Sequence, residues 1–269
     1  MIKQVKRAAR RLICGPRIHQ VRKTDAADIL ALLQRIRPVV CPELIRVGPD
    51  GDGGYLVPND LDGIEACFSP GVDQISGFET QCADRGMRVF LADHSVERPP
   101  DTHGLFHFTR KYVGVTTNAS FMTLDGWVDA ALPGSDGDLL LQMDIEGFEY
   151  EVLLAASDRL MQRFRVVVVE FHQLDQVWNK PFFRLWSRVF DKLLQTHYCV
   201  HNHPNNYYGT VKRNGIEVPY LTEMTFYRRD RLADPAPAPV QSFPHPLDRD
   251  NADNPSVPLP RCWYRPDPE

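Results

Sequence analysis

The chain has 269 residues, of which 43% are hydrophobic and 25% charged, with a formal net charge of −4. This length and composition suit a folded core, no apolar run is long enough to span a membrane, and the negative net charge argues against a nucleic-acid-binding protein. Six cysteines without a CxxC pair argue against a disulfide framework or a zinc site, and favour reduced thiols in a cytoplasmic protein.

Residues 1–44 are predicted to form a basic N-terminal arm and one helix. The first 23 residues contain eight Lys or Arg and no acid, so the arm is expected either to be a solvated helix or to contact an anionic membrane surface or a phosphorylated substrate. Thr24 is the predicted N-cap of a second helix that ends near Arg37. Its apolar residues have helical spacing: Ile29, Leu32, Leu33 and Ile36.

Residues 45–58 are predicted to form a hairpin or tight loop, because glycines interrupt two short β-like runs. These glycines are Gly48, Gly51, Gly53 and Gly54. A hairpin explains them without a ligand, and the phosphate-binding pattern GxxxxGK[ST] is absent. Asp52 and Tyr55 are nevertheless candidates for the wall of a substrate site.

Residues 65–93 predict a strand, a glycine-containing turn, a helix to Arg85 and a second strand that ends at Asp93. An acid about 20 residues after such a turn is the pattern with which nucleotide-binding folds hold ribose hydroxyls. We therefore expect Asp93 to bind a ribose, and the turn residues Ser69, Gly71 and Asp73 to lie beside the same cofactor. Gly71 is nearly alone where dinucleotide folds have GxGxxG, which favours a cofactor with a ribose but no phosphate.

Residues 137–154 predict a strand, an acidic turn and a helix, and a strand at 104–117 and a helix capped by Thr123 precede them. The strand is a continuous apolar run typical of a strand buried on both faces, and Asp144 and Glu146 stand at its end. Apolar residues then recur every four positions and predict a single amphipathic helix. They are Phe148, Val152, Ala156, Leu160 and Phe164.

The next apolar run, residues 165–174, is predicted to be the neighbouring parallel strand, and it ends in Glu170 and His172. Because the carboxyl ends of parallel strands meet at one sheet edge, we expect Asp144, Glu170 and His172 to converge. Asp144, Glu146 and His172 are the candidate catalytic residues. Taken singly, each has a structural explanation as a helix cap or a satisfied core residue.

The remaining residues predict a helix at 182–195 and two final strands at 197–209 and 219–230, joined by a loop with an Asn214-Gly215 hairpin turn. Five polar residues crowd the start of this loop: His201, Asn202, His203, Asn205 and Asn206. The two histidines are a modest indication of metal binding. Residues 233–269 hold ten of the 22 prolines, which predicts an extended C-terminal tail that, like the arm, the fold does not need.

The stretch Asp144-Ile145-Glu146-Gly147, followed by Glu149 and Leu153, resembles the FkbM family of S-adenosylmethionine-dependent methyltransferases. The preceding Thr123-Leu124-Asp125 and the valine-rich strand to Glu170 belong to the same resemblance, which covers residues 45–230 together with the DGGY, FSPGVD, HNHPNN and PYLTEMTFYRRD segments. Two departures stand out. Gln142 occupies a position where members usually have lysine, and the glycine-rich first motif is reduced to Ser69-Pro70-Gly71.

The resemblance implies an α/β, Rossmann-like methyltransferase domain at residues 45–232, with a seven-stranded, mostly parallel sheet, an antiparallel last strand and helices on both faces. It implies O-methylation of a small-molecule or glycan acceptor such as a sugar or polyketide hydroxyl, and S-adenosylmethionine as cofactor, with Asp144 among its contacts. Mg²⁺ is a further candidate cofactor, held by Asp144 and Glu170. The candidate acceptor contacts are Asp52, Tyr55, His203 and Asn206.

Three other functions remain open. An NAD-dependent oxidoreductase would share Asp93 but should have more glycines near Gly71. A non-catalytic nucleotide-binding module of the same fold would use the acidic edge only to hold its helix. A metal-dependent hydrolase would be built on Asp144, Glu170, His172 and His203, but no HxxEH-type ligand pair appears in the sequence.

Overall fold

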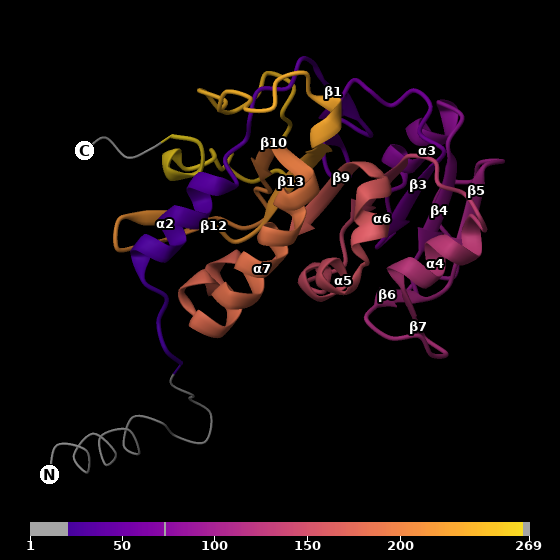
Figure 1. Ribbon diagram of the computed structural model, residues 1–269, viewed down its shortest axis with the longest axis horizontal. Coiled ribbons are helices and arrows are strands. Elements are labelled where there is room, and N and C mark those ends of the chain that lie inside the picture. Colours follow the sequence, from indigo (N-terminus) through magenta and orange to yellow (C-terminus); the bar gives the residue numbers. More distant parts are fainter. Residues whose placement is uncertain (1–20, 73, 266–269) are drawn as a thin grey trace, which may run out of the picture.

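The computed structural model describes residues 21–72 and 74–265, which are organised around one seven-stranded sheet (Figure 1). The predicted basic arm up to residue 20 and Asp73 lie outside the described residues. In spatial order the strands are β10 (His197–Pro204), β13 (Thr222–Arg228), β9 (Phe164–Phe171), β8 (Leu139–Met143), β3 (Ala66–Pro70), β4 (Arg88–Ala92) and β5 (Phe106–Thr109). Only β13 runs antiparallel to its neighbours, so the predicted α/β class and mostly parallel sheet are confirmed.

Helices cover both faces of this sheet (Figure 1). One face packs against α4 (Leu124–Ala131), α5 (Glu149–Ala155), α6 (Asp158–Arg163) and α7 (Lys180–Thr196). The other packs against α3 (Gly77–Asp84) and the antiparallel hairpin of β1 (Leu44–Val47) and β2 (Tyr55–Pro58). Since both faces are covered, every residue of β8 and β9 is buried, which explains their continuous apolar runs.

The single helix predicted after Gly147 is instead two short helices, α5 and α6. Ser157 caps the start of α6 and so separates it from α5. Its side-chain oxygen accepts a hydrogen bond from Leu160 N at 3.1 Å, and its own N–H donates to Asp125 Oδ2 at 2.9 Å. A serine that caps a new helix competes with the backbone bonds of the old one. Phe148, predicted to lie on the buried stripe, is 55% exposed.

The helix predicted near the N-terminus is α2 (Ala26–Arg35), and its apolar face is buried. The predicted N-cap is wrong, because Asp25 holds that position and the Thr24 hydroxyl donates to Val177 O at 2.8 Å. Thr123, in contrast, caps α4 as predicted and accepts from Gly126 N at 3.2 Å. No helix among the described residues has the length and apolar character that crossing a membrane requires.

Two small strand pairs complete the fold. The strands β11 (Thr210–Arg213) and β12 (Ile216–Pro219) form an antiparallel hairpin. Its turn is Asn214-Gly215, with φ values of 52° and 81°, and this left-handed pair matches the twist of the flanking strands. The strands β6 (Tyr112–Gly114) and β7 (Phe121–Thr123) form a separate parallel pair.

The C-terminal tail is mostly irregular, but it belongs to the core. Trp263, in the short 3₁₀ helix η3 (Arg261–Trp263), is fully buried, and its ring centroid lies 6.2 Å from that of Trp186 in α7. Its indole N–H donates to Glu217 O at 3.1 Å. Removing the tail should expose Trp186, so these contacts argue against the expectation that the fold does not need the tail.

Candidate active site

The carboxyl ends of β3 and β8 touch at Gly71 and Asp144. Asp144 N donates to Pro70 O at 3.3 Å. Gly71 has a φ of 96°, and a Cβ atom there would lie 1.5 Å from the carbonyl oxygen of Asp144. Glycine is therefore required at position 71 by the backbone of the neighbouring strand end, whether or not a ligand is bound.

A pocket of about 530 Å³ opens at this contact and extends past the end of β4. It brings together Gly71, Asp93 and Asp144, three of the predicted cofactor residues. Asp93 Oδ1 accepts from the backbone N–H and the hydroxyl of Ser95, both at 2.7 Å, which leaves its second oxygen for a ligand. The rest of the wall is largely apolar and includes Ala92, Tyr112, Val113, Phe121, Ile145 and Phe148. The volume and lining are typical of a small-molecule or cofactor site.

A second pocket of about 260 Å³ shares Gly71 and Asp144 with the first. Asp52 and Tyr55, two of the predicted acceptor contacts, line it. Its other lining residues are Gly53, Gln74, Ile75, Glu79 and Gln142. The two pockets therefore meet at the strand ends, where a group could be transferred between molecules that occupy them.

Ser69 is not a cofactor contact, so that prediction is wrong. It lines neither pocket, and its fully buried hydroxyl lies 2.5 Å from Glu79 Oε1 and 2.7 Å from Gln142 Oε1. Gln142 Nε2 in turn donates to the Tyr55 hydroxyl at 3.2 Å. Burial raises the pKa of Glu79, so a protonated Glu79 can donate to Ser69. These hydrogen bonds hold the Tyr55 hydroxyl in place.

His172, just beyond β9, is held by three carboxylates. Its Nδ1 lies 3.0 Å from Glu149 Oε1, and its Nε2 lies 3.7 Å from Asp144 Oδ1 and 3.5 Å from Glu146 Oε2. Glu149, the first residue of α5, is fully buried and also accepts from Ile145 N and Gly147 N. It therefore fixes both the acidic turn and the imidazole ring. Glu146 has a left-handed φ of 56°, and its side chain is 86% exposed.

This arrangement changes how strongly His172 and Asp144 bind protons. Burial raises the pKa of Asp144 to about 7; His172 opposes the rise, whereas Glu146 and Glu149 add to it. Burial acts to lower the pKa of His172, but the hydrogen bond to Glu149 and the surrounding carboxylates raise it above its ordinary value. Asp144 lines both pockets, whereas His172 lines neither and contacts Asp144. A carboxyl group that exchanges protons near neutral pH at a pocket wall is typical of acid–base chemistry.

The predicted metal pair, Asp144 and Glu170, is not the set that the structure assembles. Ligand atoms of Asp144, Glu149 and His172 lie within 4.8 Å of one another. Glu170 is instead buried, accepts from Asn205 Nδ2 at 2.8 Å and faces Glu223 on β13. Glu149 Oε1 receives two backbone N–H bonds and contacts the imidazole, whereas Glu149 Oε2 and Asp144 Oδ1 are buried without a hydrogen-bond partner among the described residues. If a metal ion binds at this edge, Asp144, Glu149 and His172 are the residues that could hold it.

Residues 72–199 match the family model described as the methyltransferase FkbM domain. The chain carries an FkbM methyltransferase domain. This confirms the family predicted from the sequence. The domain contains Asp93, Asp144, Glu149 and His172, whereas Asp52, Tyr55 and the tail lie outside the matched residues.

One solved structure, described as that of a "putative RNA methyltransferase" from Pyrococcus horikoshii, is similar at 10% identity. The similarity covers 76% of this chain and 99% of that chain, with a TM-score of 0.31. A similarity at this level supports no functional conclusion. No curated protein matches the chain.

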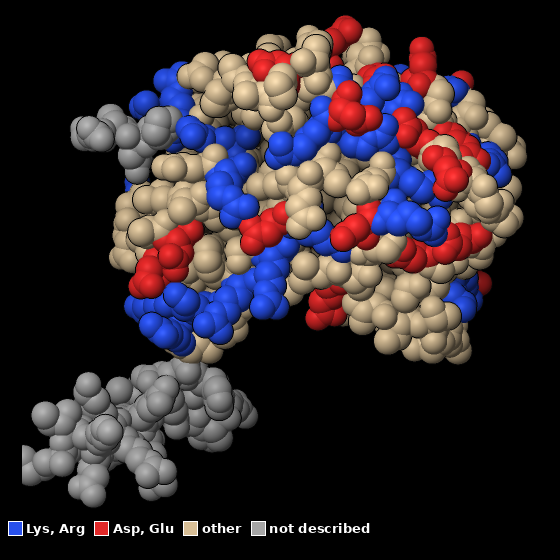
Figure 2. All heavy atoms as spheres, viewed as in Figure 1, with Lys and Arg blue, Asp and Glu red and all other residues tan. Residues whose placement is uncertain are grey.

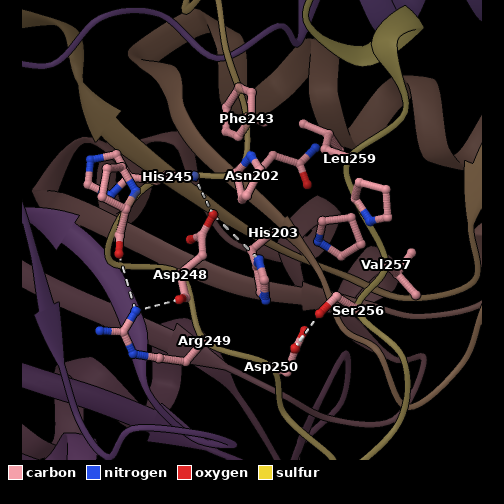
Figure 3. Close-up of a pocket in the computed structure, with 14 residues that line it drawn as sticks. Asn202, His203, Phe243, His245, Asp248, Arg249, Asp250, Ser256, Val257 and Leu259 are labelled. Carbon is pink, nitrogen blue, oxygen red and sulfur yellow. Dashed lines mark hydrogen bonds and ion pairs between the residues drawn. The ribbon is translucent and has the colours of Figure 1, made fainter.

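Two other predicted acceptor contacts, His203 and Asn206, line neither of the two pockets that share Gly71 and Asp144. Asn206 donates to Ala252 O and Asn254 O, both at 2.8 Å, and accepts from Ala252 N at 2.9 Å. It anchors the tail, so an acceptor role is wrong. His203 is buried in β10, not exposed on a loop, and lines a third pocket (Figure 3).

Glu149 was not among the functional residues predicted from the sequence. Its only signal was its place in the family-like stretch, as an acid in the first turn of a helix. That position favours an interaction with free backbone N–H groups. Its contact with His172 depends on how β9 ends beside α5, which is a tertiary arrangement.

Proposed function

We propose that the chain is an S-adenosylmethionine-dependent O-methyltransferase of Rossmann-like fold that acts on a hydroxyl of a small molecule or glycan. The observation that carries the proposal is the pair of pockets that share Gly71 and Asp144, one containing Asp93 and the other Asp52 and Tyr55. The FkbM domain match and the single antiparallel strand β13 support the same conclusion.

The larger pocket suits the cofactor. The free oxygen of Asp93 can accept from ribose hydroxyls, and the aromatic side chains of Tyr112, Phe121 and Phe148 can pack against an adenine ring. When bound, S-adenosylmethionine supplies an electrophilic methyl group. The protein must then hold the acceptor oxygen in line with that group and take up its proton.

The smaller pocket suits a neutral, hydroxyl-rich acceptor. Its carboxyl-bearing residues are Asp52, Glu79 and Asp144, and no Lys or Arg is among its described lining residues. A carboxylated or phosphorylated acceptor would meet the charge of Asp52, and of Asp144 when it is ionised, without a compensating cation. Hydroxyl groups can instead donate to the carboxylates and exchange hydrogen bonds with Tyr55 and Gln142.

His172 is proposed to take the proton of the acceptor hydroxyl. Its Nε2 faces Asp144 at the pocket boundary, and Glu149 holds its Nδ1. A buried carboxylate on the far nitrogen fixes the tautomer and stabilises the imidazolium that forms, as in other histidine bases.

Cofactor binding tests the proposal without knowledge of the acceptor. Calorimetry should show that S-adenosylhomocysteine binds the parent protein and binds Asp93→Ala at least about tenfold more weakly, since the variant loses a charged hydrogen-bond acceptor. Asp84→Ala, an exposed acid at the end of α3, should bind as the parent does. Equal binding by Asp93→Ala would remove Asp93 from the site.

Two further measurements separate the alternative functions. Binding of NAD in place of S-adenosylhomocysteine would favour the oxidoreductase. Transfer of a labelled methyl group to a panel of neutral sugars and polyols should be detectable and should fail in His172→Gln. Cofactor binding without transfer to any of them would favour a non-catalytic module.

A further inference from the structure

A pocket of about 520 Å³ lies between the end of β10 and two stretches of the C-terminal tail, residues 243–250 and 256–259 (Figure 3). None of its lining residues falls within the FkbM domain match at 72–199, and it shares none with the two pockets at Gly71 and Asp144. The tail therefore builds a separate concavity on the methyltransferase domain.

Two buried hydrogen-bond donors of this pocket have no partner among the described residues. His203 is 8% exposed, and its Nε2 has no hydrogen-bond partner. Figure 3 shows its ring between Asp248 on one side and Asp250 with Ser256 on the other. Asn202 is fully buried, and its oxygen accepts from the Thr222 hydroxyl while its Nδ2 has no partner. Buried donors without acceptors are costly, so this wall favours a molecule that brings acceptor oxygens.

The charges of the pocket indicate the same kind of molecule. Asp248 lies 2.9 Å from His201 Nε2 and 3.7 Å from His203 Nδ1, and these histidines hold its pKa below the usual range although burial acts to raise it. Burial acts to lower the pKa of His203, but Asp248 and Glu223 raise it above the ordinary value. Asp248 is thus held by the two histidines, and His203 Nε2 is left without a hydrogen-bond partner among the described residues.

The other charged residues of the wall favour a ligand with a single rather than a double negative charge. Arg249 Nη1 donates to Pro246 O at 3.2 Å and to Asp248 O at 2.7 Å, and its guanidinium stays charged. Asp250 Oδ2 accepts from the Ser256 hydroxyl at 2.5 Å. A doubly charged phosphate would bring more negative charge beside Asp248 and Asp250 than a monocarboxylate would.

Apart from His245, the remainder of the wall is apolar and is made of Phe243, Val257, Leu259 and several prolines. We propose that this pocket is a second ligand site that binds a small organic monocarboxylate, whose carboxylate accepts a hydrogen bond from His203 Nε2 and whose apolar part packs against Phe243, Val257 and Leu259. The site is independent of the proposed methyl transfer.

The test measures, by calorimetry, the binding of two monocarboxylate probes to the full chain. The probes are benzoate and 3-methylbutanoate. At least one probe should bind saturably, and binding should weaken at least tenfold in His203→Gln, which removes the charge, and in Val257→Asp, which places a carboxylate on the apolar wall. The matched controls are His107→Gln and Val115→Asp, whose side chains are exposed elsewhere. They should bind within twofold of the parent.

Benzamide and inorganic phosphate distinguish the ligand class. Saturable binding of neither carboxylate, equal binding of benzamide, or tighter binding of phosphate would each overturn the proposal, as would unaffected binding in both pocket variants. Melting temperatures are measured for every variant. If His203→Gln does not fold, Val257→Asp and the imidazole ¹⁵N shift of His203 in the parent protein, with and without benzoate, decide the outcome.

Discussion

Replacing Glu149 with Gln tests whether a buried charge holds His172 in its proposed role. Glu149 is fully buried, and its Oε1 accepts from Ile145 N at 3.2 Å and Gly147 N at 3.0 Å while contacting His172 Nδ1 at 3.0 Å. A glutamine oxygen can keep the two backbone bonds. The substitution therefore removes the charge opposite the imidazole with little change of shape.

The expected cost is that of one charge-assisted hydrogen bond, about 1.5–3 kcal/mol of unfolding free energy. The pKa of folded His172 is raised above its ordinary value, so this contribution is fully present below about pH 6.5 and is lost as the pH rises through the folded pKa. In Glu149→Gln the pKa of His172 should fall. The low-pH limb of the turnover profile should then move to lower pH, and the weaker, less firmly held base should lower the maximal rate.

A double-mutant cycle with His172→Gln, followed by urea unfolding, measures this interaction directly. The coupling between residues 149 and 172 should be about 1.5–3 kcal/mol near pH 6 and clearly smaller near pH 9. Glu146→Gln is the control, because Glu146 is 86% exposed and solvent screening limits such pairs to about 0–1 kcal/mol. A coupling near zero at both pH values, or one that does not change with pH, would refute the reasoning.

Two further predictions concern the backbone at the site and the tail. Urea unfolding should show that Gly71→Ala is destabilised far more than Gly86→Ala. Both glycines have a left-handed φ, which costs alanine about 1–2 kcal/mol. Only at position 71 would the added Cβ also lie 1.5 Å from a carbonyl oxygen. Equal losses would show that the two strand ends are not in contact. Trp263→Ala should lower the unfolding free energy by about 3–5 kcal/mol. Tyr208→Ala, the control at an exposed position, should change it little. If Trp263→Ala is as stable as the parent, the tail does not complete the core.

The four predicted acceptor contacts lie in two different places, and the distance along the chain explains why. Asp52 and Tyr55 lie on the hairpin that the glycines of residues 48–54 predicted, and both line one pocket. His203 and Asn206 belong to the stretch predicted as a strand at 197–209. The tail, more than 40 residues further along the chain, occupies Asn206 and builds the pocket around His203.

Local sequence was sufficient to predict the order of strands and helices and the place of the acids at strand ends. Apolar runs, turn glycines and caps act between neighbours in the chain, so Asp144, Glu170 and His172 could be placed at one sheet edge, and Asp93 at the end of another strand, before their contacts were known. Tertiary structure decided the rest. Glu149 was brought to His172 by the packing of α5 beside β9, Gly71 was fixed by the carbonyl of Asp144, and Ser69 was turned into a buried network. These contacts join residues that are far apart in the sequence. Hydrogen bonds and steric contacts between such residues form only when the sheet has brought them together, so local sequence could not predict them.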